Sequence, residues 1–422
     1  MKNTMRVIST AATTRIDLPS WLADQDLGQQ TRSLIRGLAI GLCFSLLISG
    51  KAEAASFSFT KIADTNGSFF GFGDSDINDA GTVAFAAFTG PSIGDQAIFT
   101  SSNGTITQLT NTNDPFGNFY FGKSLDINNS GTVAFEADLN AGGQGIFTSS
   151  NGTITRLVDT NSSFSFFYDI ALNDSGTLAF TATVGQDQGI FTISNGSITP
   201  IADTSGSLTG IADPAINNSG TVAFTGTLDK EGVTTFTNIF TNSNGIISPI
   251  IDANDLFFGA TGAALNDNDT VAFRAGFLSN QNLGIFTSSN GVITKIADNS
   301  GTSLLKSFGK PLINNNGTVV FRGFSATGEV GIYTGSDSVA DKIIASGDSL
   351  FGSTVLFTAV TGLNNLNQIL FYAQLTDGTT GIYRADPISN PLTGIPEPSS
   401  VLSLLALGVV GIGSLHRRWR AQ

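Results

Sequence analysis

Ile127–Phe135, INNSGTVAF, and Ile146–Thr155, IFTSSNGTIT, form a pattern that recurs seven times along the chain. Each copy contains an asparagine, and these asparagines follow one another at intervals of 50, 45, 44, 49, 48 and 50 residues. A period of about 40–50 residues indicates a repeat architecture. The seven asparagines are Asn78, Asn128, Asn173, Asn217, Asn266, Asn314 and Asn364.

The first half of the repeat predicts two strands joined by a four-residue turn. An asparagine that heads a turn accepts a hydrogen bond from the backbone two residues later, and the glycine three positions on suits a positive φ. Two copies have Asp269 and Asn367 instead, residue types that tolerate the left-handed region. We therefore interpret these pairs as structural turns: Asn78 and Gly81, Asn128 and Gly131, Asn173 and Gly176, Asn217 and Gly220, and Asn314 and Gly317.

The strand after each turn reads Val-Ala-Phe or a close variant, so both of its faces are apolar. Such a strand is expected to lie between other sheets. A Gly-Ile-Phe-Thr strand, an Asn-Gly hairpin turn and a Thr-Ile-Thr strand follow. Four strands per repeat predict an all-β fold, a β-propeller with seven four-stranded blades. An open β-solenoid is the alternative architecture.

The two ends of the repeat region complement each other. The last repeat stops after Gly381–Tyr383 without its fourth strand, whereas Phe57–Asp64, FSFTKIAD, is a fourth strand with no repeat before it. We expect the N-terminal strand to complete the seventh blade. Such closure would remove an open sheet edge.

Residues 1–55 are expected to be a signal peptide region. Arginines precede an apolar run, Gly37–Gly50, and Ala52 and Ala54 provide an A-x-A cleavage site. Residues 56–386 form the repeat domain. From residue 55 to 395 the chain carries 28 acidic and 11 basic residues, a net charge of about −17. Such a charge disfavours nucleic acid and attracts cations.

The C-terminus has a different composition. Residues 387–398 form a Pro-rich linker, and 399–422 carry an apolar stretch followed by basic residues. The length of this apolar stretch is near the minimum that a transmembrane helix needs. The basic cluster, which includes Arg417 and Arg418, fixes its end on the cytoplasmic side.

Pro396, Glu397 and Pro398, the apolar span and the arginines together resemble the PEP-CTERM sorting signal of bacterial exported proteins. That resemblance implies processing by an exosortase-type transpeptidase near the Pro-Glu-Pro motif and a membrane stage before processing. It places the protein in the cell envelope, at the cell surface or in extracellular matrix.

The repeats resemble the tandem-repeat family named for N-x-x-G-x-x-A-F. Asn128, Gly131, Ala134 and Phe135 match this motif. Copies five to seven depart from it at Asp269, Val320, and Asn367 with Leu370. The resemblance implies no activity.

The sequence excludes several kinds of catalysis in the repeat domain. The single histidine, His416, lies in the sorting tail, and the single cysteine, Cys43, lies in the signal region. A Ser-His-Asp triad and the common zinc sites are therefore not possible there. We expect no cofactor and no enzyme activity.

Three weaker features could carry chemistry. Glu136 is an acid at a position where other copies have Ala, Thr, Arg or Tyr, although a solvated residue at a strand end is the simpler interpretation. Asp74, Asp76 and Asn78 alternate oxygen ligands as calcium loops do, although capping of the turn already explains Asn78. Phe and Tyr clusters before each repeat could stack on sugars, although packing between blades is the simpler role.

From these features we expect an exported, non-enzymatic binding or structural propeller, with extracellular polysaccharide or a surface protein as partner. A carboxylate-based polysaccharide hydrolase or lyase and a calcium-dependent adhesion module stay open as alternatives.

Overall fold

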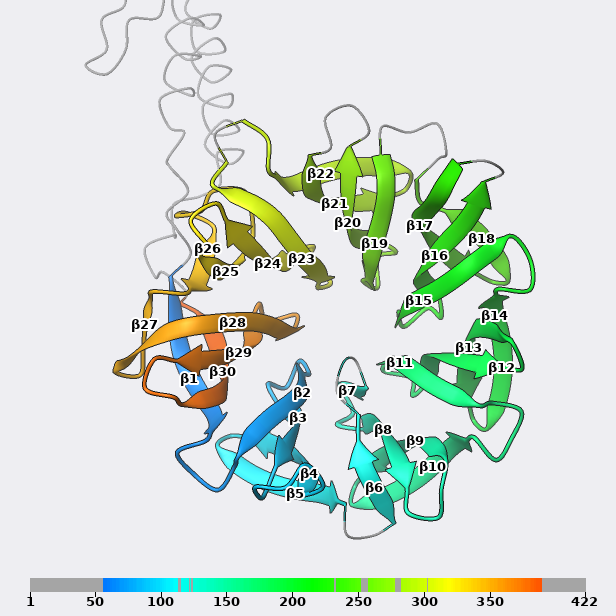
Figure 1. Cartoon of the computed structure of the whole chain (residues 1–422), viewed down its shortest axis with the longest axis horizontal. Coiled ribbons are helices and arrows are strands. Elements are labelled where there is room, and N and C mark those ends of the chain that lie inside the picture. The colour runs from blue at the N-terminus through cyan, green and yellow to red at the C-terminus, as the bar shows by residue number, and fades with distance from the viewer. Residues whose placement is uncertain are drawn as a thin grey trace, which may run out of the picture. The chain divides into compact units, whose positions relative to one another are not determined.

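The computed structural model describes residues 56–388, apart from 113, 114, 121, 123, 231, 232, 252–256, 278–281 and 302. Its strands form seven antiparallel sheets arranged around a central axis (Figure 1). The predicted seven-bladed β-propeller is therefore confirmed, and the solenoid alternative is wrong.

In blades 1 to 6 the strands follow the chain order from the axis outward. Blade 1 has β2 (Gly71–Ile77), β3 (Val83–Phe88), β4 (Gln96–Ser102) and β5 (Thr105–Asn111). Blade 2 has β6 (Phe116–Phe119), β7 (Leu125–Ile127), β8 (Val133–Leu139), β9 (Gln144–Ser150) and β10 (Thr153–Asp159). Blade 3 has β11 (Phe166–Leu172), β12 (Leu178–Val184), β13 (Asp187–Ser194) and β14 (Ser197–Asp203).

Blades 4 to 6 repeat this order, and blade 7 differs. Blade 4 has β15 (Leu208–Ile216), β16 (Val222–Lys230), β17 (Val233–Ser243) and β18 (Ile246–Pro249). Blade 5 has β19 (Phe257–Leu265), β20 (Val271–Phe277), β21 (Leu283–Ser289) and β22 (Val292–Asp298). Blade 6 has β23 (Leu305–Ile313), β24 (Val319–Ser325), β25 (Val330–Tyr333) and β26 (Lys342–Ala345). In blade 7, β28 (Ser353–Leu363), β29 (Ile369–Leu375) and β30 (Thr380–Pro387) follow from the axis outward, and β27 (Ser349–Leu350) forms a short hairpin with β28.

The N-terminal strand closes the ring, as the sequence predicts. β1 (Phe57–Asp64) pairs antiparallel with β30, with Thr60 opposite Arg384 and Ala63 opposite Ile382. The Thr60 hydroxyl also donates a hydrogen bond to the Asp386 carboxylate at 2.8 Å. Phe57 and Phe59 pack partly buried on blade 7, so each stabilises less than a fully buried side chain would.

The turns have the expected backbone. Gly131 has φ +78°, and Asp269 and Asn367 have φ +54° and +58° at the equivalent positions. The Asn-Gly hairpins between the third and fourth strands have positive φ at both residues, as in Asn151 (+50°) and Gly152 (+77°), which is the geometry of a type I′ turn.

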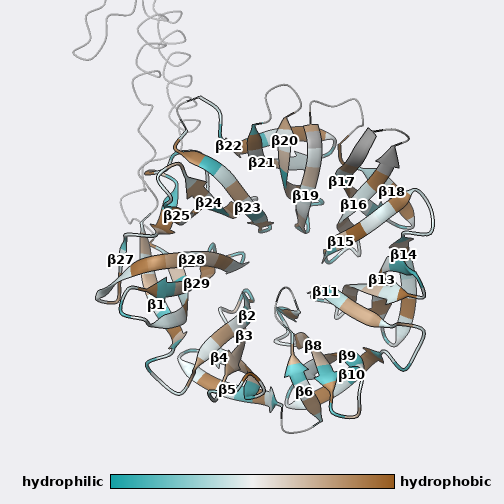
Figure 2. Cartoon of the chain, viewed as in Figure 1, coloured by the Kyte–Doolittle hydropathy of each residue, from teal (hydrophilic) through white to brown (hydrophobic). Residues whose placement is uncertain are grey.

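The hydrophobic core lies between the blades. One cluster joins Ala84 and Ala86 of blade 1 to Val133 and Phe135 of blade 2, and the other blades pack in the same way. Both faces of the Val-Ala-Phe strands are therefore buried, as predicted. Figure 2 shows the hydrophobic residues along these strands, with hydrophilic segments among the strands of blade 2.

The described residues contain no helix long and apolar enough to cross a membrane. The signal peptide region and the transmembrane sorting tail that the sequence predicts lie outside the described residues.

Candidate functional site

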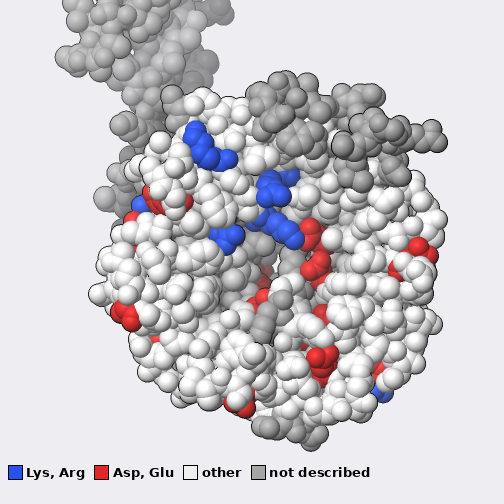
Figure 3. Space-filling view, viewed as in Figure 1, with Lys and Arg blue, Asp and Glu red and all other residues white. Residues whose placement is uncertain are grey.

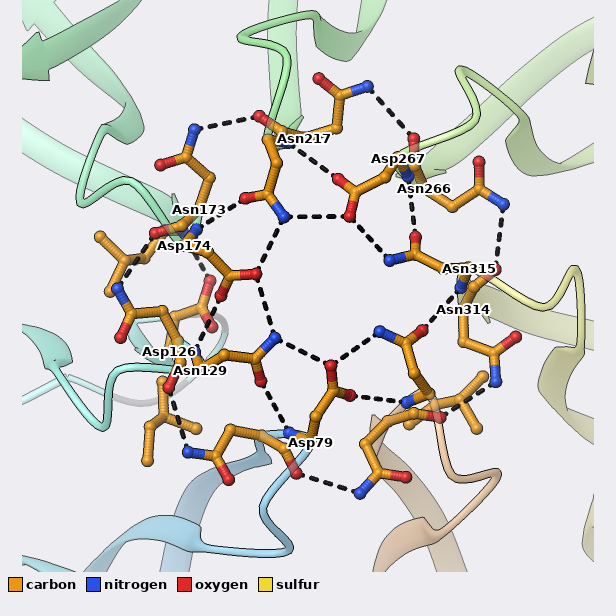
Figure 4. A pocket seen from close by; sticks show the side chains of 18 of the residues that line it. Asp79, Asp126, Asn129, Asn173, Asp174, Asn217, Asn266, Asp267, Asn314 and Asn315 are labelled. Carbon is orange, nitrogen blue, oxygen red and sulfur yellow. Dashed lines mark hydrogen bonds between the residues drawn. The ribbon is translucent and has the colours of Figure 1, made fainter.

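The seven turn asparagines form a closed ring of hydrogen bonds around the axis (Figure 4). Each Nδ2 donates to the backbone oxygen of the equivalent asparagine in the next blade, at 3.0–3.2 Å. The Oδ1 atom of each asparagine accepts a hydrogen bond within its own turn. The Oδ1 of Asn128, for example, accepts from the backbone N–H groups of Ser130 and Thr132. The asparagines were predicted to shape turns, but they also join neighbouring blades.

The next residue of each turn forms a second ring. Around the axis these residues read Asp79, Asn129, Asp174, Asn218, Asp267, Asn315 and Asn365. Each backbone N–H donates to the Oδ1 of the next member at 2.8 Å. This ring is the main feature that the sequence reasoning missed, although Asp or Asn follows the turn asparagine in all seven copies.

Aspartate and asparagine alternate in the second ring, and the alternation has a physical reason. The Oδ2 atoms of Asp79, Asp174 and Asp267 each accept two amide N–H groups from the neighbouring asparagines, at 2.7–3.0 Å. Because the ring has an odd number of members, one pair of neighbours must be alike. That pair is Asn315 and Asn365, so no two carboxylates are adjacent.

The two rings line an axial cavity of about 240 Å³, together with apolar residues such as Ile127 and Leu172. Both carboxylate oxygens of Asp79, Asp174 and Asp267 in the second ring accept hydrogen bonds. Charged hydrogen bonds of this kind are among the stronger ones in proteins. We conclude that the two rings hold the blades together.

The three candidates for a calcium loop point to separate partners. Asp74 accepts hydrogen bonds from the backbone N–H groups of Gly122 and Ser124 in blade 2. Asp76 is part-buried beside Asp126, and desolvation, followed by the charge of Asp126, raises the pKa of Asp76 well above its usual value. Asn78 belongs to the first ring. Among the described residues, no group of three or more His, Cys, Asp or Glu could hold a metal ion.

Glu136 is not solvated, so the simple interpretation of this residue is wrong. It is only 2% exposed, on the face of β8 that looks toward blade 3, and its Oε1 has no hydrogen-bond partner. Burial, together with the charges of Asp138, Asp169 and Asp74, raises the pKa of Glu136 to about 8. Glu136 is therefore protonated at neutral pH, unlike an ordinary carboxyl group.

The aromatic clusters divide into two kinds. Phe69, Phe116 and Phe164 pack on the phenylalanines of their own blades. Phe116 also shares a core cluster with Ala84 and Ala86 of blade 1, which agrees with the predicted packing between blades. Phe166 and Tyr168 of blade 3 are instead 40% and 39% exposed, and Phe166 contacts Tyr120 of blade 2.

The opening of the ring carries opposite charges on its two sides (Figure 3). The first two strands of blades 5 and 6 carry Arg274 in β20, Lys306 and Lys310 in β23 and Arg322 in β24. Lys310 reaches across blade 5 to an ion pair with Asp213 of blade 4. This path needs Gly262, because a Cβ there would lie 2.7 Å from the Lys310 Cγ.

Comparisons with known proteins agree with this architecture. Residues 118–252 and 199–402 match a family of unknown function, DUF7453. The chain belongs to this family. Residues 394–418 match the PEP-CTERM protein-sorting motif, so that resemblance is confirmed. The N-x-x-G-x-x-A-F resemblance is not confirmed. A search of curated proteins found no match.

Two solved propellers illustrate the structural likeness. Oligogalacturonate lyase from Vibrio parahaemolyticus is 12% identical, with a TM-score of 0.55 over 78% of this chain and 97% of that one. The propeller domain of the Trilobed protease from Pyrococcus furiosus is 11% identical, with a TM-score of 0.54 over 78% and 97%. At such identities the likeness shows the fold alone. The Pyrococcus domain is described as having an open velcro topology, whereas β1 and β30 pair here.

The sorting motif indicates an exported protein of the cell envelope or surface that is processed by an exosortase-type system. The cleavage residues Ala52 and Ala54, the motif residues Pro396, Glu397 and Pro398, and the basic residues Arg417 and Arg418 all lie outside the described residues.

Proposed function

We propose that the mature propeller is a non-enzymatic binding or structural module held at the cell surface or in extracellular matrix. The observation that carries this proposal is that every carboxylate oxygen of the second ring accepts a hydrogen bond from a neighbouring blade. Groups that act in acid–base catalysis must be free to exchange a proton with a substrate. The three carboxylates of the second ring have no such freedom.

A second candidate function rests on Glu136. A protonated carboxyl beside Asp138, whose side chain is partly exposed, gives two acids in different environments, as glycoside hydrolysis requires. The near-complete burial of Glu136 speaks against direct contact with a substrate.

One assay separates the two candidates. The exported protein is incubated with uncharged and acidic polysaccharides, and new reducing ends and unsaturated products are measured. The proposed function expects neither product above the level of a Glu136→Gln variant. Product formation by the wild type that this variant loses would establish the hydrolase or lyase and overturn the non-enzymatic role.

Processing can be tested separately. In a host with an exosortase, we expect mass spectrometry to find a mature chain that begins near Ala55 and ends close to the Pro-Glu-Pro motif. A host without the exosortase serves as the control. Recovery of exported protein that still carries Trp419 from the first host would contradict this expectation.

A further inference from the structure

An aromatic row crosses the boundary between blades 2 and 3. The ring centroids of Tyr120 and Phe166 lie 6.4 Å apart, and those of Phe166 and Tyr168 lie 4.9 Å apart. Phe166 and Tyr168 are about two-fifths exposed, whereas Phe164 and Phe167 beside them are buried in the core. The row therefore exposes aromatic surface to solvent instead of burying it in the core. A tyrosine ring, which is apolar with a polar hydroxyl, is suited to a contact that stays partly hydrated.

Polar groups border this row on the blade 2 side. The Tyr120 hydroxyl donates a hydrogen bond to Asp138 Oδ1 at 2.5 Å. Asn118 Nδ2 donates to Asp138 Oδ2 at 3.4 Å, near the limit for a hydrogen bond. Because Asn118 is exposed and Asp138 is half-buried, both retain capacity to bind a ligand hydroxyl.

Behind Asp138 two buried polar atoms lack a well-formed hydrogen bond. Gln144 lies opposite Asp138 in the β8–β9 pairing, and its Oε1 accepts from the Phe167 N–H at 3.2 Å, but its Nε2 lies near the Tyr120 hydroxyl without a well-formed hydrogen bond. Glu136 Oε1, on the same face of β8, has none either. Most buried polar groups in proteins are hydrogen-bonded, so these two atoms point to an ordered water that links them to a ligand hydroxyl at the surface, without direct contact between Glu136 and the ligand.

The charges around the row restrict the class of ligand. Asp138 and Asp169 lie at this boundary, and the repeat region carries a net charge of about −17. Polyanions are therefore repelled. A ligand with apolar C–H faces for the rings and hydroxyls for the carboxylate and amide groups fits both features, and sugar rings have this combination.

We propose that Tyr120, Phe166 and Tyr168 form a stacking platform for an uncharged polysaccharide, whose hydroxyl groups bind Asp138 and Asn118. This inference rests on the proposed function, because it names the ligand class of the binding module. If an activity assay detects cleavage, the non-enzymatic role fails while the platform stands. If no uncharged polysaccharide binds, the platform fails while the non-enzymatic role stands.

The test is native gel electrophoresis of the exported protein in gels that contain hydroxyethyl cellulose, mixed-linkage β-glucan or galactomannan, with alginate as the polyanion. We expect at least one uncharged polymer to retard the wild type and alginate to leave its migration unchanged. The double variant Phe166→Ala, Tyr168→Ala should weaken the retardation at least fivefold. Phe70→Ala, which removes a 61% exposed ring from blade 1, is the matched control and should migrate like the wild type.

A second variant guards against loss of folding. Asp138→Asn keeps the size of the side chain and should weaken retardation while the melting temperature stays within a few degrees of the wild type. The proposal is overturned if no uncharged polymer retards the wild type, if alginate alone does, or if both the platform variant and Asp138→Asn bind like the parent.

Discussion

At position 131 a single backbone angle explains the choice of residue. Gly131 has φ +78°, and a Cβ placed there would meet no atom within 4 Å. The need for glycine therefore comes from the backbone conformation and not from crowding. Asp269 has the same conformation but also accepts a hydrogen bond from Asn217 Nδ2 at 2.8 Å, so aspartate there serves the first ring as well as the turn.

Gly131→Val should lower the free energy of unfolding by about 1–3 kcal/mol, because a β-branched residue is strained at positive φ. Gly131→Asn is the matched control and should cost less, since asparagine tolerates this region. Chemical denaturation measures both values. Equal stability of the valine variant and the wild type would contradict the turn assignment.

Asp269→Gly tests the second role of that residue. Relief of the positive φ should stabilise the turn, whereas loss of the bond from Asn217 should cost about 0.5–1.5 kcal/mol. We therefore expect a net change close to zero in thermal or chemical unfolding. A clear stabilisation would show that the bond contributes little.

Glu136 makes stability depend on pH. Its pKa is about 8 in the folded chain against an ordinary 4.5, so the folded state holds an extra proton between these values. Its contribution to stability is therefore greatest below pH 4.5 and falls as the pH rises toward 8, by up to about 1.4 kcal/mol per pH unit. Above pH 8 the ionised, buried carboxylate is least favourable.

Glu136→Gln should remove this dependence. We expect the variant to melt at nearly the same temperature as the wild type at pH 5 and at a higher temperature at pH 9. Asp187→Asn, which changes an exposed carboxylate in the next blade, is the control and should follow the wild type. Parallel melting curves of the glutamine variant and the wild type across this range would contradict the burial of an unpaired carboxyl group.

At the scale of the elements, the alternation of the second ring is the feature with the clearest consequence. Asn129 donates to both Asp79 and Asp174, so Asn129→Asp would remove two hydrogen bonds and place three carboxylates in a row. Asn365→Asp would remove one bond and place only two carboxylates together. Because these side chains are partly solvated, we expect Asn129→Asp to lower the free energy of unfolding by about 1–3 kcal/mol. Asn365→Asp should lower it by about half as much.

Urea unfolding at pH 7 and pH 4 measures this prediction. Protonation of the added carboxyl at low pH should restore part of the lost stability. If the two variants are equally stable, the alternation of aspartate and asparagine does not contribute to the stability of the fold.

Local patterns predicted the elements because each depends on a few neighbouring residues. Asn128 with Gly131 predicted a turn, and Asn151 with Gly152 predicted a hairpin, and both were correct. The second ring was missed because its bonds join Asp79 and Asn129, fifty residues apart, and appear only when the blades meet. Burial of Glu136 was missed for a similar reason, since its surroundings include residues of another blade.

At the scale of the whole molecule, closure depends on two strands from opposite ends of the repeat domain. β1 supplies the outer strand of blade 7, and the first asparagine ring also closes there, from Asn364 to Asn78. The β1–β30 pairing at the outside and the Asn364–Asn78 hydrogen bond at the axis thus both join the two ends of the repeat domain. The sequence indicated the outer contact because one strand was missing at one end and in excess at the other.

An engineered disulfide tests this closure most directly. Ser58 and Asp386 lie opposite each other in the β1–β30 pairing, and the repeat domain has no cysteine of its own. In the variant Ser58→Cys, Asp386→Cys, mild oxidation should therefore join the two thiols within one chain and raise the melting temperature relative to the reduced protein. The control Ser58→Cys, Thr153→Cys places its second thiol on β10 of blade 2 and should stay reduced. Two free thiols in the first variant after oxidation, with no change in melting temperature, would contradict a ring closed by the N-terminal strand.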